Sequence, residues 1–176
     1  MAADLNSSST RSLLQDGFVN SGLELSSRFV MAPMTRQKSP NNIPGADVAK
    51  YYRSRVEGGV GLIITEGTYI GHPSAHHYPN VPAFYGKGLE GWKHVVDEVH
   101  AAGGKIVPQL WHTGIERRPG DGPDPLLPGF GPSEIRENDQ VVVKAMTQQD
   151  IDQVVSAFAE AALNAKKLGF DGIEIH

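Results

Sequence analysis

Hydrophobic residues along the chain alternate between short, nearly continuous apolar runs and longer stretches with apolar residues at helical spacing. Four runs read as strands: residues 29–34, 60–65, 105–111 and 170–176. Continuous apolar runs of this length are typical of strands in parallel sheets, which are covered on both faces. In the third run Pro108 cannot donate a hydrogen bond to a neighbouring strand, which works against that strand.

Three amphipathic helices are predicted between these runs, over residues 46–57, 89–102 and 148–168. Glycine follows each of them, as expected where a chain leaves a helix. In the last helix Thr147 is a candidate N-cap, with Asp150 three residues on. Its expected buried stripe consists of Ile151, Val154, Val155, Phe158, Ala162, Ala165 and Leu168.

Two further segments complete the predicted organisation. A short hairpin is expected over residues 17–25, with its turn at residues 20–22. The stretch from His112 to Met146 is rich in Gly, Pro and Asp, and we expect a long loop there.

Strand and helix alternate three times, which predicts right-handed βαβ units and a parallel sheet. Two architectures fit this alternation: an open doubly wound sheet and a closed eight-stranded barrel. The first strand–helix junction, residues 33–39, lacks the Gly-rich fingerprint of a dinucleotide fold, and no GxxxxGK[ST] motif occurs. Polar residues at the strand ends favour the barrel, in which chemistry occurs at that end.

Composition narrows the functional classes. The chain of 176 residues has a net charge of −4 and no Lys/Arg cluster, which argues against nucleic acid as a partner. Without cysteine it has no disulfide, thiol nucleophile or thiolate metal site. No apolar run is long enough to span a bilayer, and residues 1–12 form a Ser-rich flexible tail unlike a signal peptide. We therefore expect a cytoplasmic protein that has no membrane partner.

Polar candidates gather where the predicted strands end: Thr35, Thr65, Glu66, Gln109, His112, Glu174 and His176. Such a mouth offers hydrogen bonds and the flat ring of Trp111 but few charges, which suits a neutral planar heterocycle. Gln109 both donates and accepts, so it matches an imide or amide edge. Gly67 lets a ring approach the backbone closely. Each of these residues also has an ordinary structural explanation. Their occurrence together at one mouth supports a binding site more strongly than any single residue does.

Two other kinds of site are alternatives to a mouth that binds a planar heterocycle. Paired carboxylates for glycoside cleavage remain an alternative, since Glu66 and Glu174 both end strands. By alternation, however, Glu66 faces away from Thr65 and Gly67, toward the helices. The histidines of residues 72–77 have no carboxylate among them and no helical frame, which disfavours a metal site there.

At these same positions the chain resembles the Old Yellow Enzyme family of FMN-dependent ene reductases. The matching pieces are residues 28–36 (RFVMAPMTR), 61–68 (GLIITEGT), 107–114 (VPQLWHTG), 131–133 (GPS) and 169–176 (GFDGIEIH). They follow the family's order and extend the resemblance over residues 13–176. Thr35 stands where the thermophilic bacterial branch carries Cys, so the chain resembles the classical branch.

The resemblance implies a TIM (β/α)8 barrel with FMN across its C-terminal mouth. Pro33, Met34 and Thr35 would line the isoalloxazine, with the Thr35 hydroxyl at flavin O4. Gly67 would face the ring through its backbone, and Gln109 would hydrogen-bond its pyrimidine edge.

By the same resemblance, the activity is reduction of electron-poor alkenes, such as α,β-unsaturated carbonyl or nitro compounds, with NADPH or NADH as reductant. His176 would donate to the substrate oxygen. Trp111 would shape the substrate pocket.

The resemblance covers the first four strands of the family's barrel, so residues 13–176 are expected to form its N-terminal half. The family's tyrosine proton donor and phosphate-binding loops would lie downstream. Such a half has open sheet edges, and we expect poor solubility, self-association or complementation by a missing C-terminal half. The alternative is a catalytically inactive half-barrel that binds flavin weakly or assembles with another chain.

Overall fold

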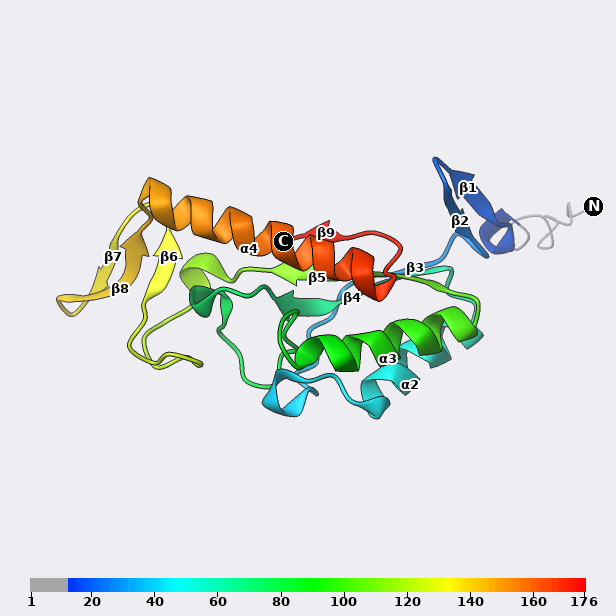
Figure 1. The fold of residues 1–176 in the computed structure, drawn as a ribbon, viewed down its shortest axis with the longest axis horizontal. Coiled ribbons are helices and arrows are strands. Elements are labelled where there is room, and N and C mark those ends of the chain that lie inside the picture. Colours follow the sequence, from blue (N-terminus) through cyan, green and yellow to red (C-terminus); the bar gives the residue numbers. More distant parts are fainter. Residues whose placement is uncertain (1–12) are drawn as a thin grey trace, which may run out of the picture.

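A four-stranded parallel sheet forms the centre of the computed structural model, which describes residues 13–176 (Figure 1). The flexible tail predicted over residues 1–12 lies outside the described part. The sheet order is β3-β4-β5-β9, with bounds Val30–Met31, Leu62–Tyr69, Lys105–Trp111 and Glu174–Ile175. Every neighbouring pair is parallel, which confirms the four predicted strands and leaves β3 and β9 at the two edges.

Three long helices cover one face of this sheet. They are α2 (Ala46–Glu57), α3 (Gly88–Ala101) and α4 (Gln148–Leu168). Their buried side chains form a single core with Ile63 of β4 and Ile106 of β5. Among residues 13–176 these helices all lie on one face, unlike the helices of a doubly wound sheet, and the described fold is α/β without a closed barrel. None of the helices along residues 13–176 has the length and apolar character that a bilayer crossing requires.

The clearest helix, α4, begins and ends as its sequence predicts. The Thr147 hydroxyl accepts the backbone N–H of Asp150 at 3.2 Å, and the Asp150 carboxylate accepts the backbone N–H of Thr147 at 2.8 Å. This reciprocal capping box satisfies donors that would otherwise be left over in the first turn. Gly169 ends the helix in the left-handed conformation, with φ at 89°.

The buried stripe of α4 agrees with the predicted one in part. Ala165 is buried as predicted, and four further members of the predicted stripe are partly buried against the core: Val154, Phe158, Ala162 and Leu168. The prediction is wrong for Ile151 and Val155, which are 41% and 61% exposed and which no described element covers. Ala157 and Ala161 are buried in addition, and their small side chains let α4 approach its neighbours closely.

The first predicted strand is also less covered than expected. Only Val30–Met31 pairs with β4, and Val30 and Met34 are 50% and 53% exposed. β3 is an edge strand, so its continuous apolar run has a neighbour on one side only. The prediction of coverage on both faces is therefore wrong for this strand in the described chain.

A register shift in β4 explains how Pro108 fits inside β5. Ile64 pairs with Val107, whereas Gly67 pairs with Gln109, so two residues of β4 stand opposite Pro108. The Thr65 hydroxyl accepts the backbone N–H of Gln109 at 3.1 Å, replacing a backbone partner. The expectation that Thr65 and Gly67 share a face relied on strict alternation, which the shift interrupts.

The stretch from His112 to Met146 is not simply a loop. It contains the 3₁₀ turn η3 (Gly114–Glu116) and a sheet of order β6-β8-β7, with bounds Gly129–Gly131, Gln140–Ala145 and Ile135–Glu137. Asn138 and Asp139 have φ values of 47° and 64°, as required in the tight turn between β7 and β8. The prediction missed these strands because they are short and set among Gly and Pro.

The predicted hairpin is present as β1 (Phe18–Asn20) and β2 (Leu23–Leu25), with Ser21 and Gly22 at positive φ. Figure 1 shows this hairpin and the β6-β8-β7 sheet at opposite ends of the molecule. Two further 3₁₀ turns, η1 (Pro40–Asn42) and η2 (Pro73–Ala75), follow β3 and β4.

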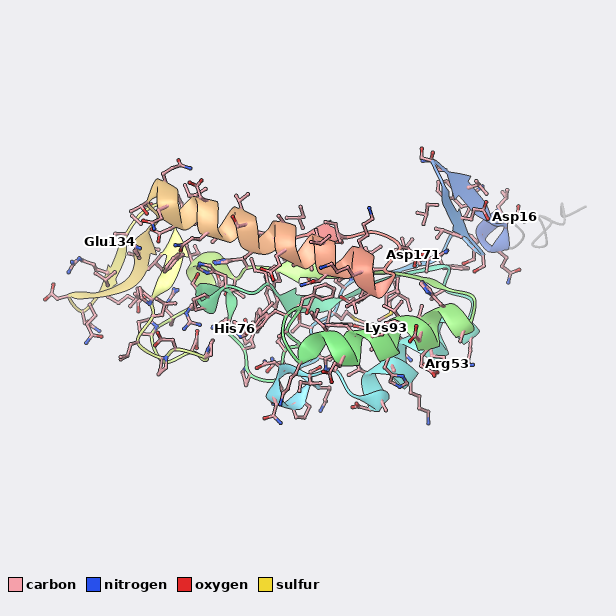
Figure 2. The ribbon with its side chains drawn as sticks, in the orientation of Figure 1. Asp16, Arg53, His76, Lys93, Glu134 and Asp171 are labelled. Carbon is pink, nitrogen blue, oxygen red and sulfur yellow. The ribbon has the colours of Figure 1, made fainter. Side chains whose placement is uncertain are left out.

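Charged side chains link elements at the surface and at the start of the sheet (Figure 2). Arg53 of α2 pairs with Glu98 of α3 at 2.9 Å. Asp171, just after α4, accepts the backbone N–H of Ile106 at 2.9 Å and pairs with His100 at 2.8 Å. The contacts of Asp171 join the start of β5 to the segment that leads into β9, far from the polar strand ends.

Candidate active site at the carboxyl ends of the strands

Three neighbouring strands place polar positions in one row across the sheet. Gly67 of β4 pairs with Gln109 of β5, and Gln109 pairs with Glu174 of β9. The Gln109 side-chain amide donates to the Glu174 carboxylate at 2.6 Å. Gln109 is buried, whereas Glu174 is half-buried. The row therefore presents a fixed amide beside a carboxylate on the face away from the helices.

Trp111 and His176 lie directly beyond this row. Their ring centroids are 6.2 Å apart, and the backbone N–H of His112 donates to the His176 carbonyl at 3.2 Å. A Cβ added at Gly67 would stand 2.2 Å from the Trp111 ring. Glycine at position 67 thus has a packing reason in addition to the one expected from sequence, because only its bare α-carbon leaves room for the indole.

The predicted Pro33–Thr35 segment follows β3 at the same end of the sheet. Met34 and Thr35 are exposed and Pro33 is half-buried. The next residue, Arg36, donates its backbone N–H to the Glu66 carboxylate of β4 at 3.0 Å. The structure thus brings Gly67, Gln109, Trp111 and His176 into one cluster and joins the Pro33–Thr35 segment to β4 through Arg36.

Two aromatic residues near Trp111 were missed in the sequence. Tyr69 stacks on Trp111 with centroids 5.7 Å apart, and Tyr78 lies 6.3 Å from it. The Tyr69 hydroxyl accepts the backbone N–H groups of His77 and Tyr78, at 3.2 and 2.8 Å. Tyr69 was recoverable, since it lies two residues after Gly67 on the same strand. Tyr78 comes from a loop, where spacing gives no guide.

A directed chain of hydrogen bonds lies behind this cluster. The Gly114 N–H donates to His112 Nδ1 at 3.0 Å, so His112 Nε2 carries the proton and donates to Ser74 Oγ at 2.9 Å. Ser74 Oγ then donates to His72 Nδ1 at 2.7 Å. Both imidazoles are neutral in this arrangement. Burial lowers the pKa of His72, and lowers that of His112 to about 4.

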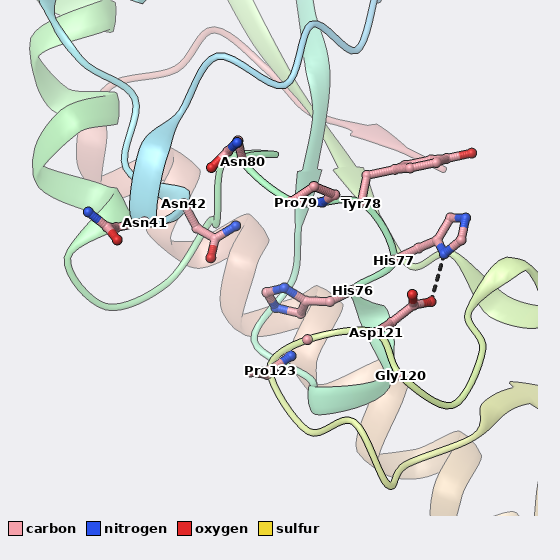
Figure 3. Close-up of a pocket in the computed structure, with 11 residues that line it drawn as sticks. Asn41, Asn42, His76, His77, Tyr78, Pro79, Asn80, Gly120, Asp121 and Pro123 are labelled. Carbon is pink, nitrogen blue, oxygen red and sulfur yellow. Dashed lines mark hydrogen bonds and ion pairs between the residues drawn. The ribbon is translucent and has the colours of Figure 1, made fainter.

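The histidines of residues 72–77 have separate partners. His76 bonds the Tyr85 hydroxyl at 2.8 Å, and His77 pairs with Asp121 at 2.7 Å. Among residues 13–176, no group of three or more His, Asp or Glu side chains is placed to hold a metal ion. His76 and His77 instead line a cavity of about 500 Å³ between the loops after β3, β4 and β5 (Figure 3).

Arg117 shapes the loop that closes one side of this cavity. Its buried guanidinium donates to the carbonyl oxygens of five residues: His76, Asp121, Gly122, Asp124 and Leu127. These bonds run at 2.6–3.3 Å. A single side chain therefore organises the turn near residues 117–127 through backbone contacts.

The two carboxylates of the glycosidase alternative have different partners. Glu66 is fully buried beside Arg36, and its backbone N–H donates to the Tyr52 hydroxyl of α2 at 2.8 Å. Glu174 lies on the opposite face with Gln109. Glu66 faces the helices, as predicted, and the pair does not flank a shared space.

The mouth suits the isoalloxazine of FMN in its chemistry. Gln109 supplies an amide for hydrogen bonding, Thr35 an exposed hydroxyl, and Trp111 a flat wall. Arg36, which follows the Pro33–Thr35 segment, is engaged with Glu66. The described site therefore suits the neutral ring of the cofactor better than its phosphate.

Known proteins resemble this chain in both structure and sequence. Morphinone reductase in complex with tetrahydroNAD matches with a TM-score of 0.83 and 33% identity, over 93% of this chain and 48% of that chain. Such structural neighbours are TIM-barrel flavoproteins, so the described fold is a partial barrel of that class. The family model for NADH:flavin oxidoreductase / NADH oxidase matches residues 19–176. The chain belongs to this family, which includes the Old Yellow Enzyme proteins.

Curated relatives of similar sequence support membership of this family. A putative 12-oxophytodienoate reductase 6 of rice is 37% identical over 92% of this chain and 42% of the relative. An NADP-dependent oxidoreductase of Aspergillus flavus is 38% identical over 93% of this chain and 43% of the relative. The chain thus spans less than half the length of these relatives. Enzymes of the family use FMN with NADH or NADPH.

Proposed function

We propose that the chain forms the N-terminal half of an FMN-dependent oxidoreductase that reduces the C=C bond of electron-poor alkenes with NADPH or NADH. The observation that carries the proposal is the row of Gly67, Gln109 and Glu174, bordered by Trp111 and His176, at the carboxyl ends of a parallel sheet. Membership of the NADH:flavin oxidoreductase family supports it.

Five residues would hold the flavin ring. Pro33, Met34 and Thr35 line it, and the Thr35 hydroxyl donates at flavin O4. Gln109 bonds the pyrimidine edge, oriented by its bond to Glu174, and Gly67 approaches through its backbone. When bound, FMN supplies the hydride acceptor and donor that no amino-acid side chain can provide.

His176 and Trp111 would act on the substrate. A ring N–H of His176 donates to the carbonyl or nitro oxygen of the alkene and stabilises the negative charge that develops there. Trp111, backed by Tyr69, walls the pocket and keeps the alkene flat against the site. Morphinone reductase forms a complex with tetrahydroNAD, and the Aspergillus flavus relative is an NADP-dependent oxidoreductase, which supports a nicotinamide reductant at the same mouth.

We further propose that residues 13–176 are one half of a barrel that a C-terminal half completes. The edge strands β3 and β9, and exposed apolar residues on α4, support this. The second candidate is an inactive half-barrel that binds flavin weakly or, through its open edge strands β3 and β9, assembles with another chain.

Flavin retention tests the proposal. The purified chain is saturated with FMN and freed of excess flavin, and its visible spectrum gives the flavin bound per chain. We expect retention that Gln109→Leu weakens at least tenfold, because the substitution removes the amide. Lys93→Gln, on the surface of α3, is the matched control. Retained flavin without NADPH-dependent reduction of 2-cyclohexenone favours the inactive half-barrel, and no retention contradicts a flavin site in this chain.

A further inference from the structure

Glu66 stands out as a fully buried carboxylate that lies next to the flavin-facing positions without being one of them. In sequence it directly precedes Gly67. Its partner Arg36 directly follows Thr35. The contact between Glu66 and Arg36 therefore connects the two strand ends on which the proposed flavin platform depends.

The backbone between β3 and η1 has few other supports. No backbone–backbone hydrogen bond within the described residues involves positions 33–38. The Glu66 carboxylate accepts the Arg36 backbone N–H at 3.0 Å. Gln37 has a φ of 56°, a conformation that costs a residue with a side chain. The bond from the preceding Arg36 N–H to a buried carboxylate helps to hold this turn in place.

The rest of the pocket holds the carboxylate itself. The Arg36 guanidinium lies 3.4 Å from Glu66 and stacks 3.6 Å from the centre of the Tyr51 ring. The Tyr52 hydroxyl accepts the Glu66 backbone N–H. Burial raises the pKa of Glu66, while the bonds and charge of Arg36 and Gln37 work to lower it. The buried Glu66 carboxylate thus binds both the backbone and the guanidinium of Arg36, which fixes that residue more firmly than an exposed ion pair would.

We infer that Glu66 is a positioning residue: it fixes the Pro33–Thr35 segment against β4, so that Thr35 and Gly67 take their places on one platform. This inference rests on the proposed function for its link to flavin. The positioning itself is a property of the chain and is measurable without flavin.

The test is Glu66→Gln, followed by amide hydrogen exchange. Gln keeps the shape but loses the charge, so exchange in peptides covering residues 33–38 should quicken about tenfold or more. Glu57→Gln, which removes an exposed carboxylate paired with Arg53, is the matched control and should change nothing there. Arg36→Lys keeps the backbone donor, so it should retain most of the protection.

FMN binding supplies a second readout that a purely structural role would leave unchanged. Glu66→Gln should shift the visible flavin spectrum and weaken affinity, while Glu57→Gln, which removes an exposed carboxylate, should not. Unchanged exchange at residues 33–38 overturns the inference, as does exchange that quickens equally throughout the chain. If exchange quickens locally but the wild-type chain retains no FMN, the positioning stands and the proposed function fails.

Discussion

The two faces of the central sheet are made from alternate residues of the same strands, yet they differ in burial and in polarity. On the helix side, Ile63, Ile106 and Leu110 are fully buried in one core. On the other side, the neighbouring Ile64 and Val107 are only half-buried, and Gln109 and Glu174 lie near the carboxyl ends of their strands. One face stabilises the described chain, and the other is available for ligands or for further protein.

This difference shows where stability and function can be separated. Burial of apolar area stabilises the helix side regardless of any partner. The opposite face is covered by no described element, so its apolar residues contribute less until something packs on them. Substitutions on adjacent positions of one strand should therefore have very different effects.

The largest expected effect comes from breaking the helix side. Ile106→Ala should lower the free energy of unfolding by about 2–5 kcal/mol, because it opens a cavity in the core. Val107→Ala, one residue on, should cost about 1 kcal/mol or less. Urea denaturation of both variants measures the contrast. Equal costs would mean that the two faces are equally covered.

A smaller effect should appear with pH in the polar region around His112. Its folded pKa of about 4 lies below the ordinary value of 6.5, so the unfolded state binds more protons between these values. Stability should be constant above pH 7 and fall as the pH drops from 6.5 toward 4. His112→Gln should make this fall about 1.4 kcal/mol per pH unit shallower at most, in urea titrations across that range. Parallel curves for the two proteins would contradict a buried neutral His112.

The smallest effect on stability should come from the uncovered side of α4. Val155→Ser should change the free energy of unfolding by only about 0.5 kcal/mol, since the side chain is largely exposed. Sedimentation velocity should nevertheless show less self-association than in the wild-type chain. Ser156→Ala, at the next position on the same helix, is the control. An unchanged sedimentation profile for Val155→Ser would remove this residue from the interface.

Local pattern was enough to predict the elements of the central fold. Periodicity located α3 and α4, and residues 147–150 marked the start of α4 because a capping box is a short-range feature. The burial of individual side chains by neighbouring elements was less predictable. Val155 looks buried by spacing alone, but its exposure depends on whether a neighbour packs there, which no local pattern contains.

The candidate active site, too, could be predicted only in part from local sequence pattern. Gln109 and Trp111 were identified as candidates because they share one face of a strand, and the structure places their side chains on that face. The bond from Gln109 to Glu174 and that from Arg36 to Glu66 join distant segments, and both depend on register. Alternation along one strand does not reveal which residues of neighbouring strands lie opposite each other, and the shift opposite Pro108 shows that this pairing can change within a strand.

The guanidinium of Arg117 has a consequence for how the loop can vary. Because it binds carbonyl oxygens, which every residue carries, its contacts with residues 122 and 127 do not depend on the side chains there. Asp121 is different, since its carboxylate accepts the Arg118 backbone N–H at 2.8 Å and pairs with His77. Substitution of Leu127 therefore leaves this support of the loop in place, whereas substitution of Asp121 removes contacts of its own from the wall of the cavity.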